Sequence, residues 1–406
     1  MDLIPLPKEK LNLGMSLRFT LRDEAGSILL AKGQRIETPH QLAAIKARRA
    51  LFIEIEESED AVRLMMSGLA ELDRAGAPIK DLSKYVHVKR EAEEEKLTGS
   101  LVQRWSDVES KLAGPLASAT NTPEFERKIR TAARHIHSLV TEDLNGSQFL
   151  LFNRAVSHFT GYSVTHSLLC ATLADSLAEV FSLSSDQRES LVCAALTMNV
   201  AMTALQDELA LQKNTPSPLQ RSIIDTHSQA GRAVMEKVGV TDPLWLYVVA
   251  NHHAPLEGPE ALAAWETPQK LAKILQTVDR YTAAMSPRKS RSGRTARDSV
   301  KTVVVQAGST KHDEVGTALV RILGLCPPGT YVKLVNGETA VVMRRGVKPA
   351  EPLVAAVLNR NDEPIAEPRL RDTSREVAIQ ATLAATSVRV NLKLDVMLRM
   401  MPRQPT

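Results

Sequence analysis

The chain has 406 residues, and its 51 Lys and Arg against 47 Asp and Glu leave a formal net charge of only +4. This near balance argues against a strongly basic surface for nucleic acid or membranes. No stretch approaches 18 uncharged apolar residues and no signal-peptide pattern opens the chain, so we expect a cytoplasmic protein without a transmembrane helix.

Residues 1–85 are predicted to form a small α+β module. The segment 17–33 alternates on either side of Ala25-Gly26, which is typical of a β-hairpin. Thr38-Pro39 indicates a helix start, and the apolar run 51–53 indicates a short strand.

Residues 86–150 are polar with helical periodicity and are predicted to form a helical linker. A run of charges at 89–96 fits a solvated helix face. A dimerising or signal-transmitting coiled helix is the alternative.

Residues 151–326 are predicted to form a helical domain. Capping boxes stand at Ser184 with Gln187 and at Ser217 with Gln220, and Gly239 marks a helix end. Residues 327–406 are predicted as a β extension and tail, in which Asn336-Gly337 between two strand-like runs indicates a hairpin. The tail after about 375 has no clear pattern. The fold class expected is therefore mainly α, with small β-containing modules at both ends.

The three cysteines, Cys170, Cys193 and Cys326, are far apart and lie in apolar contexts. An odd, sparse set predicts buried thiols in a reducing compartment rather than a disulfide framework.

The most informative pattern is a set of residues that ligate divalent metals: His166, His227, His252, His253 and Asp279. Each lies on or beside a run with helical periodicity, and helices of a compact bundle can point such side chains at one another. A lone histidine on an apolar helix is commonly a core residue. The adjacent pair His252-His253 is costlier to bury unless it is hydrogen-bonded or metal-bound.

The order and spacing of this set resemble the HD-GYP subgroup of the HD metal-dependent phosphohydrolases, a family implicated in degrading cyclic di-GMP. The resemblance covers about residues 150–370, and the N-terminal module also resembles a small domain that precedes it in some members. Asp279, Tyr281 and Ala283 match the family's Asp-x-Tyr-x-Ala stretch. Arg288 and Arg291 match two arginines that lie near the substrate phosphates in the family. The resemblance implies an HD-type helical bundle from about 150 to 326, with His166, His227, His252, His253 and Asp279 as metal ligands.

The departures from the family are equally specific. The His-Asp dyad that names it aligns with Met198-Asn199, no lysine occurs within 200–203, and the Gly-Tyr-Pro position reads Glu260-Ala261-Leu262. The dyad's aspartate is implied to bridge two metals, whereas an asparagine offers one neutral carbonyl oxygen. Methionine is a soft thioether and a poor ligand for Fe, Mn or Zn. We therefore predict that hydrolysis is lost or impaired, and name no catalytic residue.

A residual site remains. His227, His252 and His253 could hold one divalent metal (Fe, Mn or Zn) with a water completing the shell, or they could be structural histidines with no metal. The basic stretch 288–297 could clamp phosphate, since arginine forks suit phosphate oxygens, or form a solvated loop.

Three functions stay open at this point. The first is a pseudoenzyme that senses cyclic di-GMP or a related nucleotide or binds a protein partner. The second is an active metal-dependent cyclic di-GMP phosphodiesterase with an altered site. The third is a scaffold that needs no ligand. A protein partner is expected, and the oligomeric state is left open.

Overall fold

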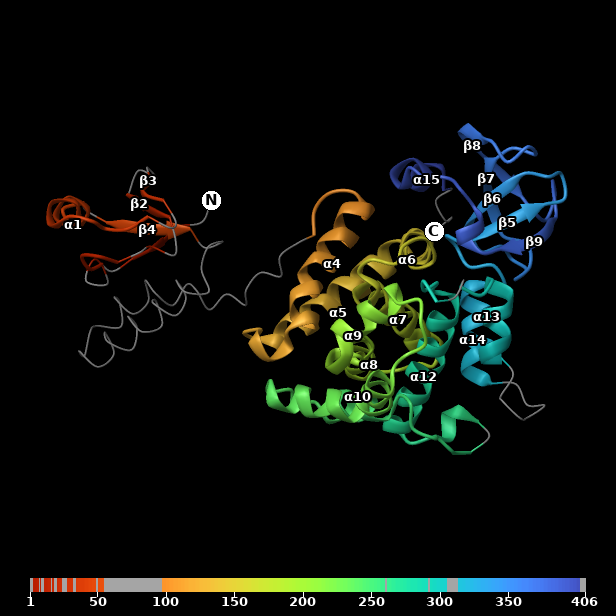
Figure 1. The fold of residues 1–406 in the computed structure, drawn as a ribbon, viewed down its shortest axis with the longest axis horizontal. Helices are drawn as coiled ribbons and strands as arrows, with labels where there is room; N and C mark the ends of the chain where they lie inside the picture. The colour runs from red at the N-terminus through yellow and green to blue at the C-terminus, as the bar shows by residue number, and fades with distance from the viewer. Residues whose placement is uncertain are drawn as a thin grey trace. The chain divides into compact units, whose positions relative to one another are not determined.

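The computed structural model describes residues 3–6, 8, 11–15, 17, 20–23, 28–31, 34–48, 50–54, 97–259, 261–290, 293–304 and 313–401 (Figure 1). The chain divides into two compact units, residues 1–96 and 97–406. The predicted turn at Ala25-Gly26, the charge run at 89–96, Glu260 and Arg291 lie outside the described residues.

The first unit is an α+β module, as predicted. Its strands are β1 (Leu3–Pro5), β2 (Leu21–Asp23), β3 (Ile28–Leu30) and β4 (Leu51–Glu54), and helix α1 spans Pro39–Lys46. The sheet is antiparallel in the order β1-β4-β2-β3, and Leu21 pairs with Leu30 in the predicted hairpin. The Thr38 side chain accepts a hydrogen bond from the Gln41 N–H and caps α1. Aliphatic side chains from the strands and from α1 form its core.

The second unit is mainly helical. Its longer helices are α4 (Leu101–Ala117), α5 (Phe125–Glu142), α6 (Leu144–Ser157), α7 (Tyr162–Val180), α8 (Ser185–Thr197), α10 (Pro218–Lys237) and α12 (Thr267–Met285). Shorter ones are α9 (Thr203–Leu211), α11 (Pro243–Asn251), α13 (Ala296–Val304), α14 (Glu314–Leu323) and α15 (Leu394–Met400). No helix in the described part of the chain is long and apolar enough to cross a membrane.

Helix α7 is the central element of this unit. It is buried on nearly all sides and packs against α5, α6, α8, α9 and α12. Most of its side chains are apolar, as expected for a core helix, and its buried polar residues include His166 and Asp175. Both predicted capping boxes form, at the starts of α8 and α10. Gly239, with φ of +89°, follows the end of α10 as expected.

The predicted helical linker differs from what the structure shows. From Leu97 on, these residues belong to the second compact unit, and α4 and α5 pack into its core. The apolar residues of α4 recur every three or four positions among polar ones, so a single face of the helix is buried: Leu101, Trp105, Val108, Leu112 and Leu116. The Trp105 Nε1–H donates to Ser147 Oγ at 3.1 Å, which ties α4 to α6.

The C-terminal β region is larger than the predicted hairpin extension. Strands β5 (Tyr331–Leu334), β6 (Thr339–Arg344), β7 (Leu353–Leu358), β8 (Pro364–Asp372) and β9 (Ile379–Leu383) form an antiparallel sheet. The order is β8-β7-β6-β5-β9, so the segment after 375 adds an edge strand beside β5. The turn at Asn336-Gly337 joins β5 to β6 as predicted.

Side chains on alternate positions of these strands face the helices and pack against them. Val341 and Met343 of β6 belong to the main core, whereas Val342 belongs to a small cluster with residues of β5 and β7. Successive side chains of a strand point to opposite faces, so one face of the sheet packs on the helical unit. Met397 of α15 also belongs to the main core.

Gly329, just before β5, sits where the sheet meets α6. Its φ is +83°, and an added Cβ would lie 2.5 Å from the backbone N of Asn153 and the backbone O of Phe149. We expect Gly329→Ala to lower the free energy of unfolding by about 2 kcal/mol or more, because it combines backbone strain with a backbone clash.

Urea unfolding of two separate variants, Gly329→Ala and the control Gly239→Ala, tests this expectation. Gly239 has a similar φ of +89° but open space around the added Cβ, so it isolates the conformational cost of about 1 kcal/mol. Equal losses in the two variants would mean that the contact with α6 contributes nothing.

Candidate metal centre

The five predicted ligand residues come together from different helices of the second unit. His166 lies on α7, His227 on α10 and Asp279 on α12, and His252 and His253 directly follow α11. The helix pairs α7–α12, α10–α11 and α11–α12 are all in contact. The side chains form two groups, each with its candidate ligand atoms within 4.8 Å of one another. The histidine cluster is His227, His252 and His253, and the His–Cys–Asp cluster is His166, Cys170 and Asp279.

In the histidine cluster, backbone carbonyls fix the ring tautomers. His227 Nδ1 lies 2.5 Å from the Ile224 carbonyl oxygen, and His252 Nδ1 lies 2.8 Å from the Val249 carbonyl oxygen. A carbonyl oxygen only accepts, so each Nδ1 carries the proton and donates it. The Nε2 atoms of the two neutral rings therefore face each other with bare lone pairs, 3.2 Å apart. A cation at this place would relieve the repulsion.

The surroundings keep these rings neutral. Burial, reinforced by the neighbouring His253, lowers the pKa of His252 to about 3. Burial also lowers the pKa of His227. The His253 ring packs against both, with ring centroids 5.0 Å from His227 and 4.2 Å from His252. Its side chain is 49% exposed, so the cluster is reached from solvent on that side.

In the His–Cys–Asp cluster, His166 is the shared partner. Its Nε2 lies 2.8 Å from Asp279 Oδ1 and 3.7 Å from Cys170 Sγ. Burial opposes the charge of Asp279, but the hydrogen bond and positive charge of His166 outweigh it and lower the pKa of the carboxyl. The other oxygen, Asp279 Oδ2, lies 3.8 Å from His253 Nε2. The Asp279 carboxylate thus stands between the two clusters.

Met198-Asn199, the pair that replaces the His-Asp dyad of the resembled family, lies in a packed turn at the end of α8. Met198 is fully buried in the main hydrophobic core, and Asn199 is 5% exposed. The Asn199 carbonyl oxygen accepts from the Met202 N–H at 2.9 Å, closing the turn that precedes α9. Neither residue brings a negative charge to the site.

Arg288 lies beside the His–Cys–Asp cluster through Tyr162. A guanidinium N–H of Arg288 donates to Tyr162 Oη at 3.2 Å, and the guanidinium lies over the phenol ring, 5.2 Å from its centroid. The Tyr162 ring stacks on His166, with centroids 5.6 Å apart and an interplanar angle of 10°. Arg291, the other predicted phosphate ligand, lies outside the described residues.

Sequence reasoning missed Cys170 and Tyr162 as members of the site. Both stand four residues from His166 on α7, and residues four apart share a helix face. That spacing was the available signal. All three cysteines are buried and free, as predicted, but only Cys170 belongs to a candidate ligand group among the described residues.

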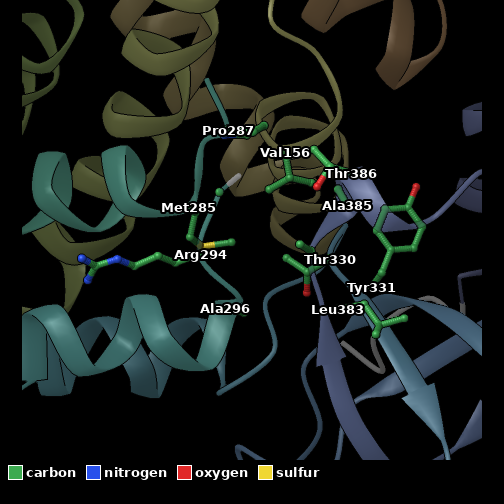
Figure 2. A pocket seen from close by; sticks show the side chains of 12 residues that line it. Val156, Met285, Pro287, Arg294, Ala296, Thr330, Tyr331, Leu383, Ala385 and Thr386 are labelled. Atoms are coloured by element: carbon green, nitrogen blue, oxygen red, sulfur yellow. The ribbon is translucent and has the colours of Figure 1, made fainter. Parts of the chain in front are cut away.

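Figure 2 shows a different cavity, between α6, the segment after α12 and the sheet. Val156, Met285, Tyr331 and Leu383 are among its lining side chains, and Arg294 extends away from it. Its volume of about 10 Å³ fits about one water molecule, which excludes a nucleotide there.

No family model and no curated protein sequence matches this chain. Among solved structures, the chain is similar to Bd1817, an HDG"Y"P protein from Bdellovibrio bacteriovorus. The identity is 14% and the TM-score is 0.43, over 79% of this chain and 99% of that chain.

Proposed function

We propose that the second unit is an HD-GYP-like module that binds a divalent metal at the histidine cluster and senses a nucleotide, with hydrolysis lost or impaired. The observation that carries the metal part is the pair of bare Nε2 atoms of His227 and His252, 3.2 Å apart. Metal-ligating histidines commonly donate their other ring N–H to a backbone carbonyl, as both do here.

The ligand chemistry favours one of Fe, Mn or Zn. Three imidazoles with an open position are a known zinc shell, and His253 stands on the exposed side where that position would face solvent. A metal bound here would supply Lewis acidity toward a ligand oxygen. The chain's own contribution is to hold the two buried rings neutral and correctly oriented.

The reasons against hydrolysis lie in the dyad position. Phosphodiester hydrolysis of this kind uses two metals that share a bridging carboxylate and water. Asn199 has no charge, Met198 is buried in the core, and residues 200–203 contain no lysine. A bound phosphodiester would therefore be held rather than cleaved.

The nucleotide part rests on Arg288 and on the family resemblance. The ring of Tyr162 lies between the Arg288 guanidinium and His166. A phosphate near the clusters would therefore be within reach of the arginine. Cyclic di-GMP or a related nucleotide is the proposed ligand. A protein partner would then read the bound state.

The test is calorimetry of the purified full chain with cyclic di-GMP, together with metal analysis and a turnover assay. We expect at least one metal equivalent, nucleotide binding and no hydrolysis. Arg288→Ala should weaken binding by about 10- to 100-fold, the size of a hydrogen bond to a charged group. Arg280→Ala, on an exposed position of α12, should leave affinity unchanged.

The other outcomes separate the alternatives. Turnover with two or more metal equivalents would mean an active phosphodiesterase with an altered site. If the protein binds neither a metal nor a nucleotide, only the scaffold function is left.

A further inference from the structure

We infer that a cavity between α5, α7 and α8 binds the oxyanion of a small organic molecule, a carboxylate or a phosphate monoester. Arg188 is the group that would hold the oxyanion, with Arg134 and His137 beside it. The cavity is separate from the candidate metal centre, so this inference goes beyond the proposed function and does not depend on it.

The cavity has the size and construction of a small-molecule site. Its volume is about 450 Å³, within the range of about 300–1,000 Å³ that is usual for such sites. Helix α5 contributes Arg134 and His137 to its lining, α7 contributes Asp175, and α8 contributes Arg188 and Glu189. The three helices pack on one another in every pairing, so their rigid backbones fix these side chains.

The cavity lies on the far side of α7 from the candidate metal centre. Asp175 follows His166 by nine residues on this helix. At 3.6 residues per turn and 1.5 Å per residue, that is about two and a half turns, or about 13 Å along the axis, and it places the two side chains on opposite sides. A small ligand in the cavity would therefore not touch the metal centre.

Arg188 is the lining residue that lacks an acceptor. Its Nε is buried and has no hydrogen-bond partner among the described residues. Its Nη1 lies 3.1 Å from Nδ1 and 3.2 Å from Nε2 of His137. A donor that is almost equally far from both ring nitrogens points along the lone pair of neither. The edge of the guanidinium that carries Nε–H is thus left for an oxyanion, which suits an arginine fork.

His137 separates the buried Asp175 carboxylate from the cavity. Its Nδ1 lies 3.0 and 3.2 Å from the two carboxylate oxygens. A carboxylate only accepts, so Nδ1 carries the proton and donates it, and this fixes the ring. The Asp175 side chain is 3% exposed and that of His137 is 46% exposed. An anion in the cavity would therefore meet the imidazole rather than the carboxylate.

The remaining charges of the lining favour an anion. The Glu189 carboxylate accepts a hydrogen bond from Arg130 Nη1 at 2.6 Å, so its charge is compensated from outside the cavity. Arg134 stands three residues before His137, on the same face of α5, and adds a positive charge beside that of Arg188. Guanidinium groups bind carboxylate and phosphate oxygens in preference to other ligands.

Two apolar side chains indicate that the ligand is organic. Ala133 and Val192 line the cavity and are almost completely buried. Small-molecule sites combine such apolar walls with a few polar groups that fix the orientation of the ligand. A ligand with an apolar part next to its oxyanion would use both, whereas inorganic phosphate would use the polar groups alone.

The experiment titrates the full chain, prepared with isotope-labelled histidine, with phenyl phosphate and with benzoate. Nuclear magnetic resonance follows the His137 ring signal, which is assigned by its loss in His137→Gln. We expect a saturable shift, and the tighter of the two probes identifies the head group. Arg188→Gln should weaken binding by about 10-fold or more, as for loss of a hydrogen bond to a charged group. Arg221→Gln, at an exposed position of α10, should bind as the unsubstituted protein does.

The inference is overturned if neither probe gives a saturable shift, if sodium chloride at the same ionic strength gives the same shift, or if Arg188→Gln binds with unchanged affinity. Circular dichroism shows whether Arg188→Gln folds. If it does not, Arg134→Gln, at an exposed position of α5, takes its place and must also weaken binding. Inorganic phosphate should bind more weakly than phenyl phosphate, and equal affinities would overturn the assignment of an organic ligand.

Discussion

Replacing His252 by alanine should lower the affinity of the protein for divalent metal by more than about 100-fold. Loss of a partner that only orients a ligand costs 10- to 100-fold, and His252 is proposed as a ligand itself. Its removal also leaves His227 Nε2 without the second nitrogen that lies 3.2 Å away. Titration of the metal-free protein with a competing chromophoric chelator measures the change.

His158→Ala is the matched control, because His158 is exposed at the end of α6 and is not in either cluster. It should bind metal as the unsubstituted protein does. An unchanged affinity in His252→Ala would mean that the histidine cluster is structural, and the metal part of the proposed function would fall.

Replacing Trp245 by alanine should cost about 3–5 kcal/mol of unfolding free energy, the range for deleting a large aromatic side chain from a core. Trp245 is fully buried on α11. Its Nε1–H donates to Thr197 Oγ1 at 2.8 Å, and the Arg130 guanidinium lies 5.5 Å from the centre of its ring. Urea unfolding followed by circular dichroism gives the difference.

Two companion variants separate the contributions. Trp245→Phe keeps most of the volume and loses the hydrogen bond, so about 1 kcal/mol is expected for that loss. Trp265→Ala, at a half-buried tryptophan, should cost clearly less than Trp245→Ala. Comparable losses at both tryptophans would contradict a dominant role for Trp245 in joining α8 to α11.

Local signals in the sequence predicted much of the fold because their physical cause is local. At a helix start, a serine and a glutamine three residues later each accept a hydrogen bond from the other's backbone N–H, and the boxes at Ser184 and Ser217 both form. Asn336-Gly337 suits the backbone of a tight hairpin, and the strands on either side pair as expected. The mainly helical class with small β-containing parts is confirmed.

What the sequence did not predict depends on partners far along the chain. Because α4 is mostly polar, the sequence did not indicate that its narrow apolar stripe is buried. That burial requires contact with α5, α6 and α7. Strand β9 pairs with β5, about 50 residues earlier, and only that pairing gives its short run a structure. The domain boundaries, accordingly, differ from those expected at 86–150.

The candidate site, too, was predicted from the sequence only in part. The spacing along the chain indicated the five ligand residues, and His227, His252 and His253 were already expected to form one site. The tautomers set by the Ile224 and Val249 carbonyls and the approach of Cys170 to His166 depend on tertiary packing, which the sequence does not show. The metal ligands stay a prediction, which the metal titration of His252→Ala tests.

The pairing of β9 with β5 has a consequence for the exposed edges of the C-terminal sheet. An uncovered strand edge is a template for another chain; β9 covers that edge of β5 and is itself a short edge strand of 5 residues, which offers few free pairing groups. At the opposite edge, β8 carries Pro364, Pro368, Arg369 and Arg371, residue types that discourage a further strand from adding. A chain ending before Ile379 would lose the cover over β5, and the sheet would then present an open edge that recruits a second copy.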